Sequence, residues 1–362
     1  MSNETPLRES AVREILAEPR WFFEDYNDVT RKLRFVRASR DILANQPFLA
    51  EGLWDYSALE MREVAESEIL ALLPTGLRKP RINFIWHTAF CCSTMIARML
   101  DRAGANLSLK EPGVLMMLAD AKRQGAIGPG QTFSNRIAEL IFTLLGRPFG
   151  EDEQVTVKPT NASNCLLRDA LAMTQGRQLF VYSDCRSFLI SVAKKKEYGR
   201  RYARLLYQTI VGDGNVQARW PMDEVLALSD LQIAALAWHM QIAEFRRSWP
   251  GIAPGRAASL DCDAFLVAPL ETLVKIDAFF GLGLGRGFLE EAVSGPAFSH
   301  HSKDVGMAFG AADRRSEHAG TAAELGRDLD EVVAWSYKRC ETTPRGAPLG
   351  NSLVAIEKAY HP

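Results

Sequence analysis

Residues 82–104 read INFIWHTAFCCSTMIARMLDRAG, and the fold class follows from this stretch. The largely apolar run at residues 82–86 predicts a buried strand. After a short turn, apolar residues recur at helical spacing and predict an amphipathic helix that Gly104 would terminate. These residues are Met95, Ile96, Met99, Leu100 and Ala103. A buried strand that leads into an amphipathic helix is the start of a βαβ unit.

Three further apolar runs repeat this arrangement, at residues 155–157, 179–182 and 257–260. Strands separated by helical stretches predict an α/β protein with a mainly parallel central sheet. Such a sheet is covered by helices on both faces, which makes three layers, α/β/α. Ligands bind at the carboxyl ends of the strands in sheets of this kind, so the turns after the strands are candidate binding positions.

A turn-rich junction precedes this region and contains Pro74, Gly76 and Pro80. It predicts a domain boundary, with an N-terminal extension at residues 1–79 and the α/β domain at residues 80–362. We expect the extension to be mostly helical, because amphipathic, charge-rich pieces follow its aromatic front and Ser39 is placed to open a helix. Only Leu33 and Phe35 alternate with charged residues in the manner of a short strand.

The composition narrows the class of partner. The chain has 362 residues, with 43 Lys and Arg against 44 Asp and Glu, a net charge of −1. A near-neutral chain argues against a nucleic-acid partner. No apolar run is long enough to cross a membrane and the polar start is not a secretory signal, so we expect a cytoplasmic protein without membrane association. The six cysteines show no CxxC spacing, and we expect reduced thiols with neither a disulfide framework nor a metal site.

The turn between the first strand and its helix is a candidate anion site. Free N–H groups and the helix dipole attract an anion at such a place. In the register of the phosphate-binding motif G-x-x-x-x-G-K-[ST] the chain has His87, Cys92, Ser93 and Thr94, so both glycines and the lysine are absent. An ordinary strand-to-helix turn is the alternative.

Five blocks between residues 82 and 282 share the order and approximate spacing of one family's motifs. They are Cys92-Ser93-Thr94, Glu111-Pro112, the run 155–159 that ends in Lys158-Pro159, the segment 183–191 with Arg186 and Ser191 in register, and the segment 259–282. Together they resemble the sulfotransferases that use 3′-phosphoadenosine 5′-phosphosulfate (PAPS), as a divergent bacterial-type member. The chain departs from the family pattern at Phe90, Cys92 and Ser183, where the family carries a basic residue, a glycine and an arginine.

The resemblance implies a P-loop fold and transfer of a sulfuryl group from PAPS to a hydroxyl or amine, in line and without a metal. The acceptor would be a small molecule or a carbohydrate. Cys92, Ser93 and Thr94 would hold the 5′-phosphosulfate, and Arg186 and Ser191 the 3′-phosphate. Lys303, in a basic C-terminal segment, would fold over the nucleotide.

Sulfuryl transfer also needs a base and positive charge on the oxygens where negative charge develops. His87, at the end of the first strand, is a candidate donor or base, and Glu111 is the other candidate base. Lys158 is the candidate cation near the leaving group. Each has a structural alternative: a hydrogen-bonded histidine, a glutamate that fixes a turn, and a solvated lysine. The basic run between Arg186 and Arg204 is either a field that attracts a nucleotide or a solvated helix face.

Two other functions remain open. The three departures fit a binding protein with a sulfotransferase fold and no catalysis. Residues 179–184 end in Asp184 after an apolar run and fit the magnesium site of an ATP-dependent kinase, although Ser93 replaces the lysine that phosphoryl transfer uses. The sequence carries no signal of oligomeric state.

Overall fold

A computed structural model describes residues 4–50, 55, 58–125, 127, 135–213, 220–295, 311–340, 343–345 and 348–354. The chain divides into two compact units. The first comprises Met1–Phe84, Leu100–Gly176 and Leu282–Leu284, and the second comprises Ile85–Met99, Arg177–Gly281 and Gly285–Pro362. Residues on both sides of the predicted domain boundary at residue 79 belong to the first unit. The boundary itself stays a prediction.

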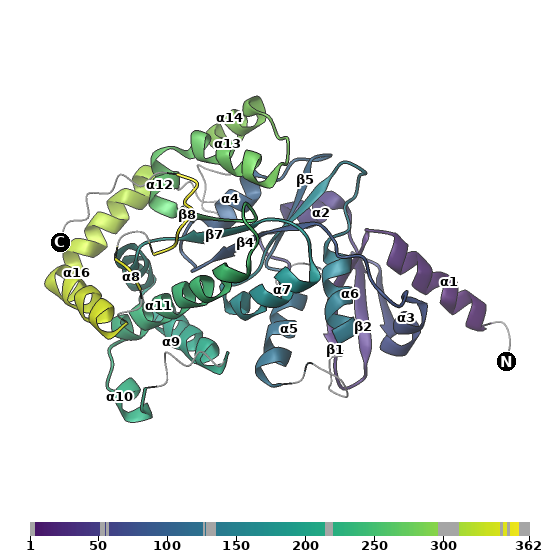
Figure 1. Ribbon diagram of the computed structural model, residues 1–362, viewed down its shortest axis with the longest axis horizontal. Helices are drawn as coiled ribbons and strands as arrows, with labels where there is room; N and C mark the ends of the chain where they lie inside the picture. Colours follow the sequence, from purple (N-terminus) through teal and green to yellow (C-terminus); the bar gives the residue numbers. More distant parts are fainter. Residues whose placement is uncertain are drawn as a thin grey trace. The chain divides into compact units, whose positions relative to one another are not determined.

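The central sheet has five strands in the order β5-β6-β4-β7-β8 (Figure 1). They are β4 (Ile82–His87), β5 (Asn106–Lys110), β6 (Gln154–Lys158), β7 (Gln178–Tyr182) and β8 (Ala257–Asp261). The pairs β5 with β6, β6 with β4, and β7 with β8 are parallel. Almost every residue of these strands is buried, as expected for a sheet with two covered faces. The predicted α/β class, a parallel sheet flanked by helices, is confirmed.

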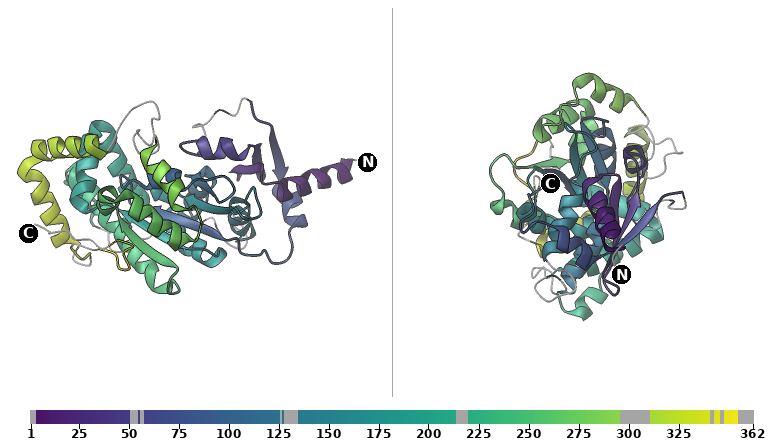
Figure 2. Two further views of the ribbon diagram at one scale, coloured as in Figure 1. Left: turned by 90° about the horizontal axis from the view of Figure 1, so that it is seen from above. Right: turned by 90° about the vertical axis from the view of Figure 1, so that its right-hand side faces the viewer.

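The helices of the first unit are α1 (Glu4–Ala17), α2 (Arg40–Asn45), α3 (Glu66–Leu72), α5 (Gly113–Arg123), α6 (Asn135–Leu145) and α7 (Leu167–Met173), with a 3₁₀ turn η1 (Asn161–Leu166). Ser39 caps α2 as expected, and its hydroxyl accepts the N–H of Ile42 at 3.2 Å. Helix α1 lies beside α3 (Figure 2).

The first unit also contains a three-stranded antiparallel sheet in the order β1-β2-β3, which the sequence did not predict as a sheet. Its strands are β1 (Trp21–Asn27), β2 (Lys32–Arg37) and β3 (Met61–Ala65). The aromatic front of the extension therefore forms a strand rather than a helix, because aromatic side chains pack well on a pleated surface. Phe23 stacks on Phe35 of the next strand with ring centroids 5.2 Å apart. The Asn27 side chain accepts two backbone N–H groups and closes the hairpin turn.

Arg147, just after α6, ties the end of α1 to the rest of the first unit. Its guanidinium donates to the carbonyl oxygens of Ile15, Leu16, Glu18 and Trp21 at 2.5–3.2 Å. Burial lowers the pKa of Arg147 to about 10, which still leaves the side chain protonated at neutral pH.

The helices of the second unit are α4 (Ser93–Met99), α8 (Cys185–Lys194), α9 (Lys196–Gly212), α10 (Met222–Leu226), α11 (Asp230–Ser248), α12 (Cys262–Val267), α13 (Pro269–Phe280), α14 (Arg286–Ser294) and α16 (Ala311–Arg339), with a 3₁₀ turn η3 (Trp249–Gly251). Helix α4 ends at Met99, earlier than the predicted stop at Gly104. Helix α16 is kinked at Gly326 and packs on α8 and α11 (Figure 1). None of the helices in the described part of the chain is both long and apolar enough to cross a bilayer.

His239, in the middle of α11, gives the second unit a pH-dependent stability. Its Nε2 lies 3.0 Å from the Ser336 hydroxyl of α16, and burial lowers the pKa of His239 from 6.5 to about 4. Between pH 6.5 and pH 4 the unfolded chain binds a proton that the folded chain does not, so the free energy of unfolding falls as the pH falls.

We expect this loss to approach about 1.4 kcal/mol per pH unit and to be weaker in His239→Gln, whose amide does not titrate. Urea unfolding at pH 7 and pH 5 measures it for both proteins. An equal loss in the two proteins would assign the pH dependence to other groups.

Candidate functional site

The predicted anion loop, residues 88–94, follows β4 and turns through three left-handed residues. The φ angle is +69° at Ala89, +53° at Phe90 and +61° at Cys92. Each such residue other than glycine costs about 1–3 kcal/mol, and such residues persist where surrounding contacts hold them, often at binding sites. The loop therefore keeps a tight, strained backbone although it contains no glycine.

Contacts within the second unit hold this backbone. The N–H of Thr88 and the thiol of Cys91 both donate to the carbonyl oxygen of Val181 in β7, at 3.2 and 3.4 Å. The ring of Phe90 packs against Phe188 of α8 and Tyr202 of α9, with centroids 5.8 and 5.4 Å away. Phe90, where the family has a basic residue, is thus a packing residue that anchors the loop to two helices.

His87 is a buried end residue of β4 whose Nδ1 accepts the N–H of Ala89 at 3.0 Å. This hydrogen bond assigns the proton of the neutral ring to Nε2. The imidazole can therefore donate from Nε2, but it has no free lone pair with which to take a proton. Of the two predicted roles, the geometry favours the donor over the base.

The loop offers hydroxyl groups to a ligand. Ser93 and Thr94 are buried residues at the start of α4, and among the described residues neither hydroxyl has a hydrogen-bond partner. The hydroxyls of Thr88, after β4, and Ser183, after β7, are fully buried and also lack a partner within the described part of the chain. Leaving a fully buried hydroxyl unpaired, as at Thr88 and Ser183, costs about 1–3 kcal/mol. A bound anion would offer acceptor oxygen atoms to the hydroxyls of Ser93 and Thr94.

Lys158 and Glu111, both in the first unit, form an ion pair at the ends of β6 and β5. The Lys158 side chain is 1% exposed, so the alternative of a solvated lysine is excluded. Its ammonium also faces the ring of Phe48, 6.0 Å from the centroid. The backbone of Glu111 is in the left-handed region, with φ of +51°. Its N–H donates to the Lys158 carbonyl oxygen at 2.7 Å. The ion pair joins the predicted base to the predicted cation.

Arg186 and Ser191, the predicted 3′-phosphate ligands, lie on α8 but have partners on α16. Arg186 Nε donates to Asp330 Oδ1 at 3.2 Å, and Ser191 Oγ lies 3.1 Å from His318 Nε2. Lys194 at the end of α8 pairs with Glu317. The sequence held no signal for these α16 residues, which lie more than a hundred positions away from their partners.

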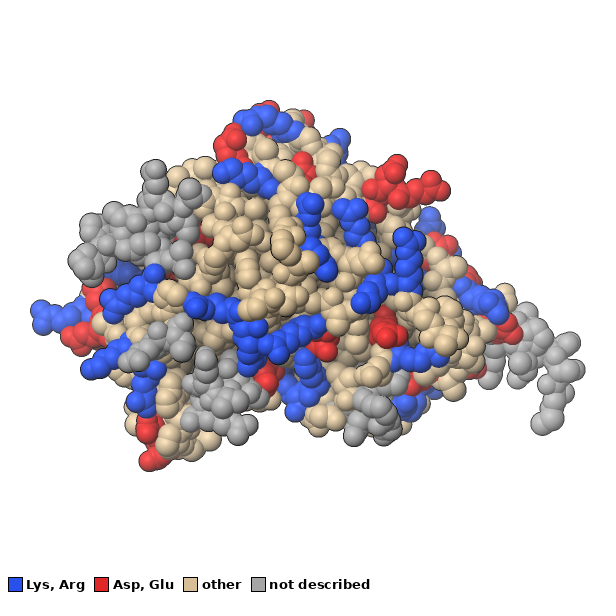
Figure 3. All heavy atoms as spheres, viewed as in Figure 1, with Lys and Arg blue, Asp and Glu red and all other residues tan. Residues whose placement is uncertain are grey.

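The basic run between Arg186 and Arg204 spans α8 and α9, and about half of it is neutralised. Arg200 and Arg204 both pair with Asp230, at 3.8 and 2.6 Å. The run's remaining cations, with no ion pair to any described residue, are Lys195, Lys196 and Arg201. Acidic side chains also lie among the basic ones on the face seen in Figure 3. The field of this segment is therefore weaker than its sequence suggests.

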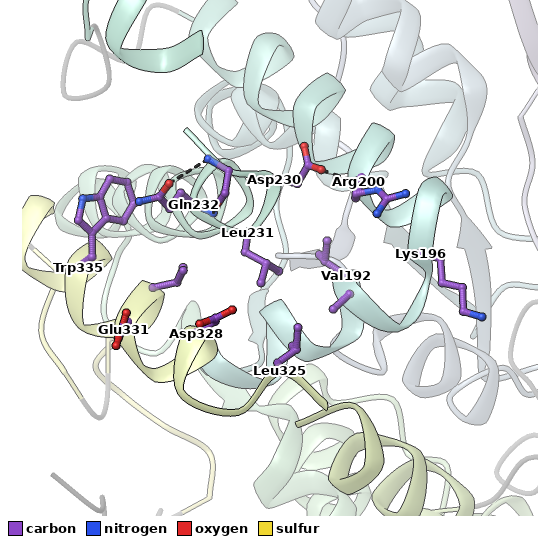
Figure 4. Close-up of a pocket in the computed structure, with 13 residues that line it drawn as sticks. Val192, Lys196, Arg200, Asp230, Leu231, Gln232, Leu325, Asp328, Glu331 and Trp335 are labelled. Atoms are coloured by element: carbon purple, nitrogen blue, oxygen red, sulfur yellow. Dashed lines mark hydrogen bonds and ion pairs between the residues drawn. The ribbon is translucent and has the colours of Figure 1, made fainter. Parts of the chain in front are cut away.

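A pocket of about 700 Å³ lies between α8, α9, α11 and α16 of the second unit (Figure 4). Val192, Leu231 and Leu325 converge on its centre, and charges of both signs line it, including Arg200 and Asp328. None of the predicted site residues is among the residues that line it.

Asp184, the acidic residue of the kinase alternative, has a structural role. Its Oδ1 accepts the N–H of Ser187 at 2.8 Å and caps α8. Among the described residues, no group of three or more His, Cys, Asp or Glu side chains is arranged so that it could hold a metal ion. Lys303 lies outside the residues that the structure describes.

No family model and no curated protein matches the sequence. Among solved structures, the fold is similar to the "Sulfotransferase Domain from the Curacin Biosynthetic Pathway". The match covers 69% of this chain and 98% of that domain, with 13% sequence identity and a TM-score of 0.42, a distant likeness.

Proposed function

We propose that the protein is a sulfotransferase-like enzyme that moves a sulfuryl group from PAPS to a hydroxyl or amine of a small molecule or carbohydrate. The main support for this proposal is the conformation of the loop at residues 88–94. It joins three strained residues to unpartnered hydroxyls, at the place where the sequence resembles the family's phosphosulfate loop. Strain and unsatisfied polar groups both cost stability, and an anion would offset the second cost.

The roles follow from the chemistry of the side chains. Hydroxyls of Ser93 and Thr94 would hold the 5′-phosphosulfate, while His87 would donate from Nε2 to an oxygen that gains negative charge. The acceptor oxygen or nitrogen forms its bond to sulfur while the bond from sulfur to the 5′-phosphate oxygen breaks. Glu111 would take the proton of the acceptor, and Lys158 would stabilise the charge on the departing phosphate. No residue is assigned to a metal in this scheme.

Arg186 and Ser191 would bind the 3′-phosphate, Arg186 through its guanidinium and Ser191 through its hydroxyl. The phosphate must then compete with Asp330 for Arg186. Both side chains of this ion pair are about half exposed or more, at 47% and 66%, and such pairs contribute little. A phosphate with two negative charges is able to displace the Asp330 carboxylate.

Thermal unfolding with 3′-phosphoadenosine 5′-phosphate tests the proposal, with ATP and magnesium as the comparison. At 100 times its dissociation constant the bisphosphate should raise the free energy of unfolding by about 2.7 kcal/mol. No stabilisation by either nucleotide would support the alternative of a binding protein with a sulfotransferase fold. Stabilisation by ATP and magnesium alone would favour a kinase.

The competition at Arg186 gives a further expected result. Asp330→Asn removes the competing charge and should tighten binding of the bisphosphate by roughly two- to fivefold, the strength of an exposed ion pair. Asp328→Asn, on the same helix, is the matched control, because Asp328 has no ion pair with the described residues of α8. Calorimetric titration of both variants measures the difference. Equal affinities would mean that the phosphate does not meet Asp330.

A further inference from the structure

Two cysteines that are far apart in the sequence meet in the second unit. Cys92 lies in the loop after β4, and Cys262 opens α12 directly after β8. The thiol of Cys262 donates to Cys92 Sγ, and the two sulfur atoms are 3.1 Å apart. A disulfide has an S–S length of about 2.0 Å, so closure needs a movement of about 1 Å.

The other four cysteines lie in environments that differ from the pair of Cys92 and Cys262. Burial raises the pKa of Cys340 to about 11 and also raises the pKa of Cys185, so both remain thiols. The thiol of Cys91 donates to a backbone carbonyl, and Cys165 lies 3.5 Å from a guanidinium nitrogen of Arg123. Cys92 is partly exposed whereas Cys262 is buried, so an oxidant from solution meets Cys92 first.

The backbone conformation at Cys92 is one that favours glycine over cysteine. Its φ of +61° is one that glycine adopts without cost, whereas a residue with a Cβ is strained there. Glycine would also remove the sulfur that faces Cys262. Cys92, one of the two residues at which this loop departs from the family pattern, therefore also supplies one half of a thiol pair.

We propose that Cys92 and Cys262 form a reversible disulfide under peroxide stress and that this bond locks the loop. The Cys92 thiolate attacks the peroxide, its sulfur is oxidised to sulfenic acid, and the peroxide oxygen is reduced and leaves as water. The Cys262 thiol then attacks the Cys92 sulfur, the S–S bond forms, and the sulfenic oxygen leaves as a second water molecule. One peroxide molecule thus takes up two electrons and two thiol protons. Disulfides of this transient, regulatory kind do occur in reducing compartments.

The effect on the ligand rests on the proposed function, whereas the bond itself does not. The Cβ of Cys92 stands where a phosphate would approach the backbone, so the loop must yield when the nucleotide enters. A loop tied to α12 cannot yield. We expect the oxidised protein to bind 3′-phosphoadenosine 5′-phosphate at least about tenfold more weakly than the reduced protein.

The test treats the full chain with one equivalent of hydrogen peroxide and maps its peptides without reduction. We expect a linked peptide pair that carries Cys92 and Cys262, and its loss after treatment with dithiothreitol. Cys92→Gly and Cys262→Ala should each abolish the link, whereas Cys91→Ser, one position away, should leave it in place. Two variants on opposite partners keep the result clear if one of them folds poorly.

The possible outcomes distinguish a failure of the proposed disulfide from a failure of the proposed function. Oxidation of Cys92 alone, or a link to another cysteine, would overturn the proposed disulfide. A correct link with unchanged nucleotide affinity would overturn the locking of the loop and leave the proposed function standing. A correct link in a protein that binds no bisphosphate in either state would support the disulfide and contradict the proposed function.

Discussion

Replacing Arg186 by alanine should weaken the binding of 3′-phosphoadenosine 5′-phosphate by roughly 10- to 100-fold. A hydrogen bond to a charged group contributes about 1.5–3 kcal/mol, and alanine offers no replacement for the guanidinium. Calorimetric titration of the bisphosphate measures the effect. The loss should be much smaller with adenosine 5′-monophosphate, which lacks the 3′-phosphate.

Arg201→Ala is the matched control for this prediction, because it removes the same charge from the neighbouring helix α9. A similar loss in both variants would show that only the general field of the basic run attracts the nucleotide. The Asp330→Asn variant excludes an indirect effect through α16. If release of α16 caused the loss in Arg186→Ala, Asp330→Asn would also weaken binding instead of tightening it.

Replacing Lys158 by methionine should slow sulfuryl transfer by roughly 100- to 1,000-fold and leave bisphosphate affinity within about tenfold. Methionine keeps the length of the side chain but cannot stabilise the charge of the leaving phosphate. Single-turnover transfer from PAPS to a simple phenol, measured beside the dissociation constant, separates the two effects. Equal losses of rate and affinity would make Lys158 a binding residue.

The same substitution leaves the Glu111 carboxylate without its partner, so stability must be measured alongside. Removing one member of a buried pair costs about 3–5 kcal/mol, and we expect less here because the Glu111 side chain is 22% exposed. Lys110→Met is the matched control. Lys110 is equally buried at the end of β5, and its ammonium donates to the Ala44 carbonyl oxygen at 2.6 Å. It should lose stability without a comparable loss of rate.

The strands were readable from the sequence because each is a short apolar run between turn signals. The run at residues 82–86 became β4 and the run at 179–182 became β7, each with one residue more at one end. Of the antiparallel sheet of the first unit, the sequence indicated only the alternation at Leu33 and Phe35, which lie in β2. The aromatic and charged residues of β1 and β3 alternate too irregularly to separate strand from helix. The stop at Gly104 was wrong because the chain leaves the helix after Met99.

The sequence predicted only part of the candidate site. Motif order located Lys158 and Glu111 at neighbouring strand ends, and the structure shows that they form an ion pair. The contacts of Arg186 with Asp330 and of Cys92 with Cys262 join residues 144 and 170 positions apart, and no local pattern encodes such a separation. The left-handed backbone at Cys92 was equally hidden, because the usual signal for it is a glycine.

The proposed function requires that this chain binds a nucleotide with phosphates on both its 3′ and 5′ oxygens. Calorimetric titration of the reduced protein with 3′-phosphoadenosine 5′-phosphate, and then with adenosine 5′-monophosphate, tests it most directly. We expect a dissociation constant in the micromolar range, about −8 kcal/mol, for the bisphosphate and an affinity at least about tenfold lower for the monophosphate. No measurable binding of the bisphosphate, or equal binding of the two nucleotides, would contradict it.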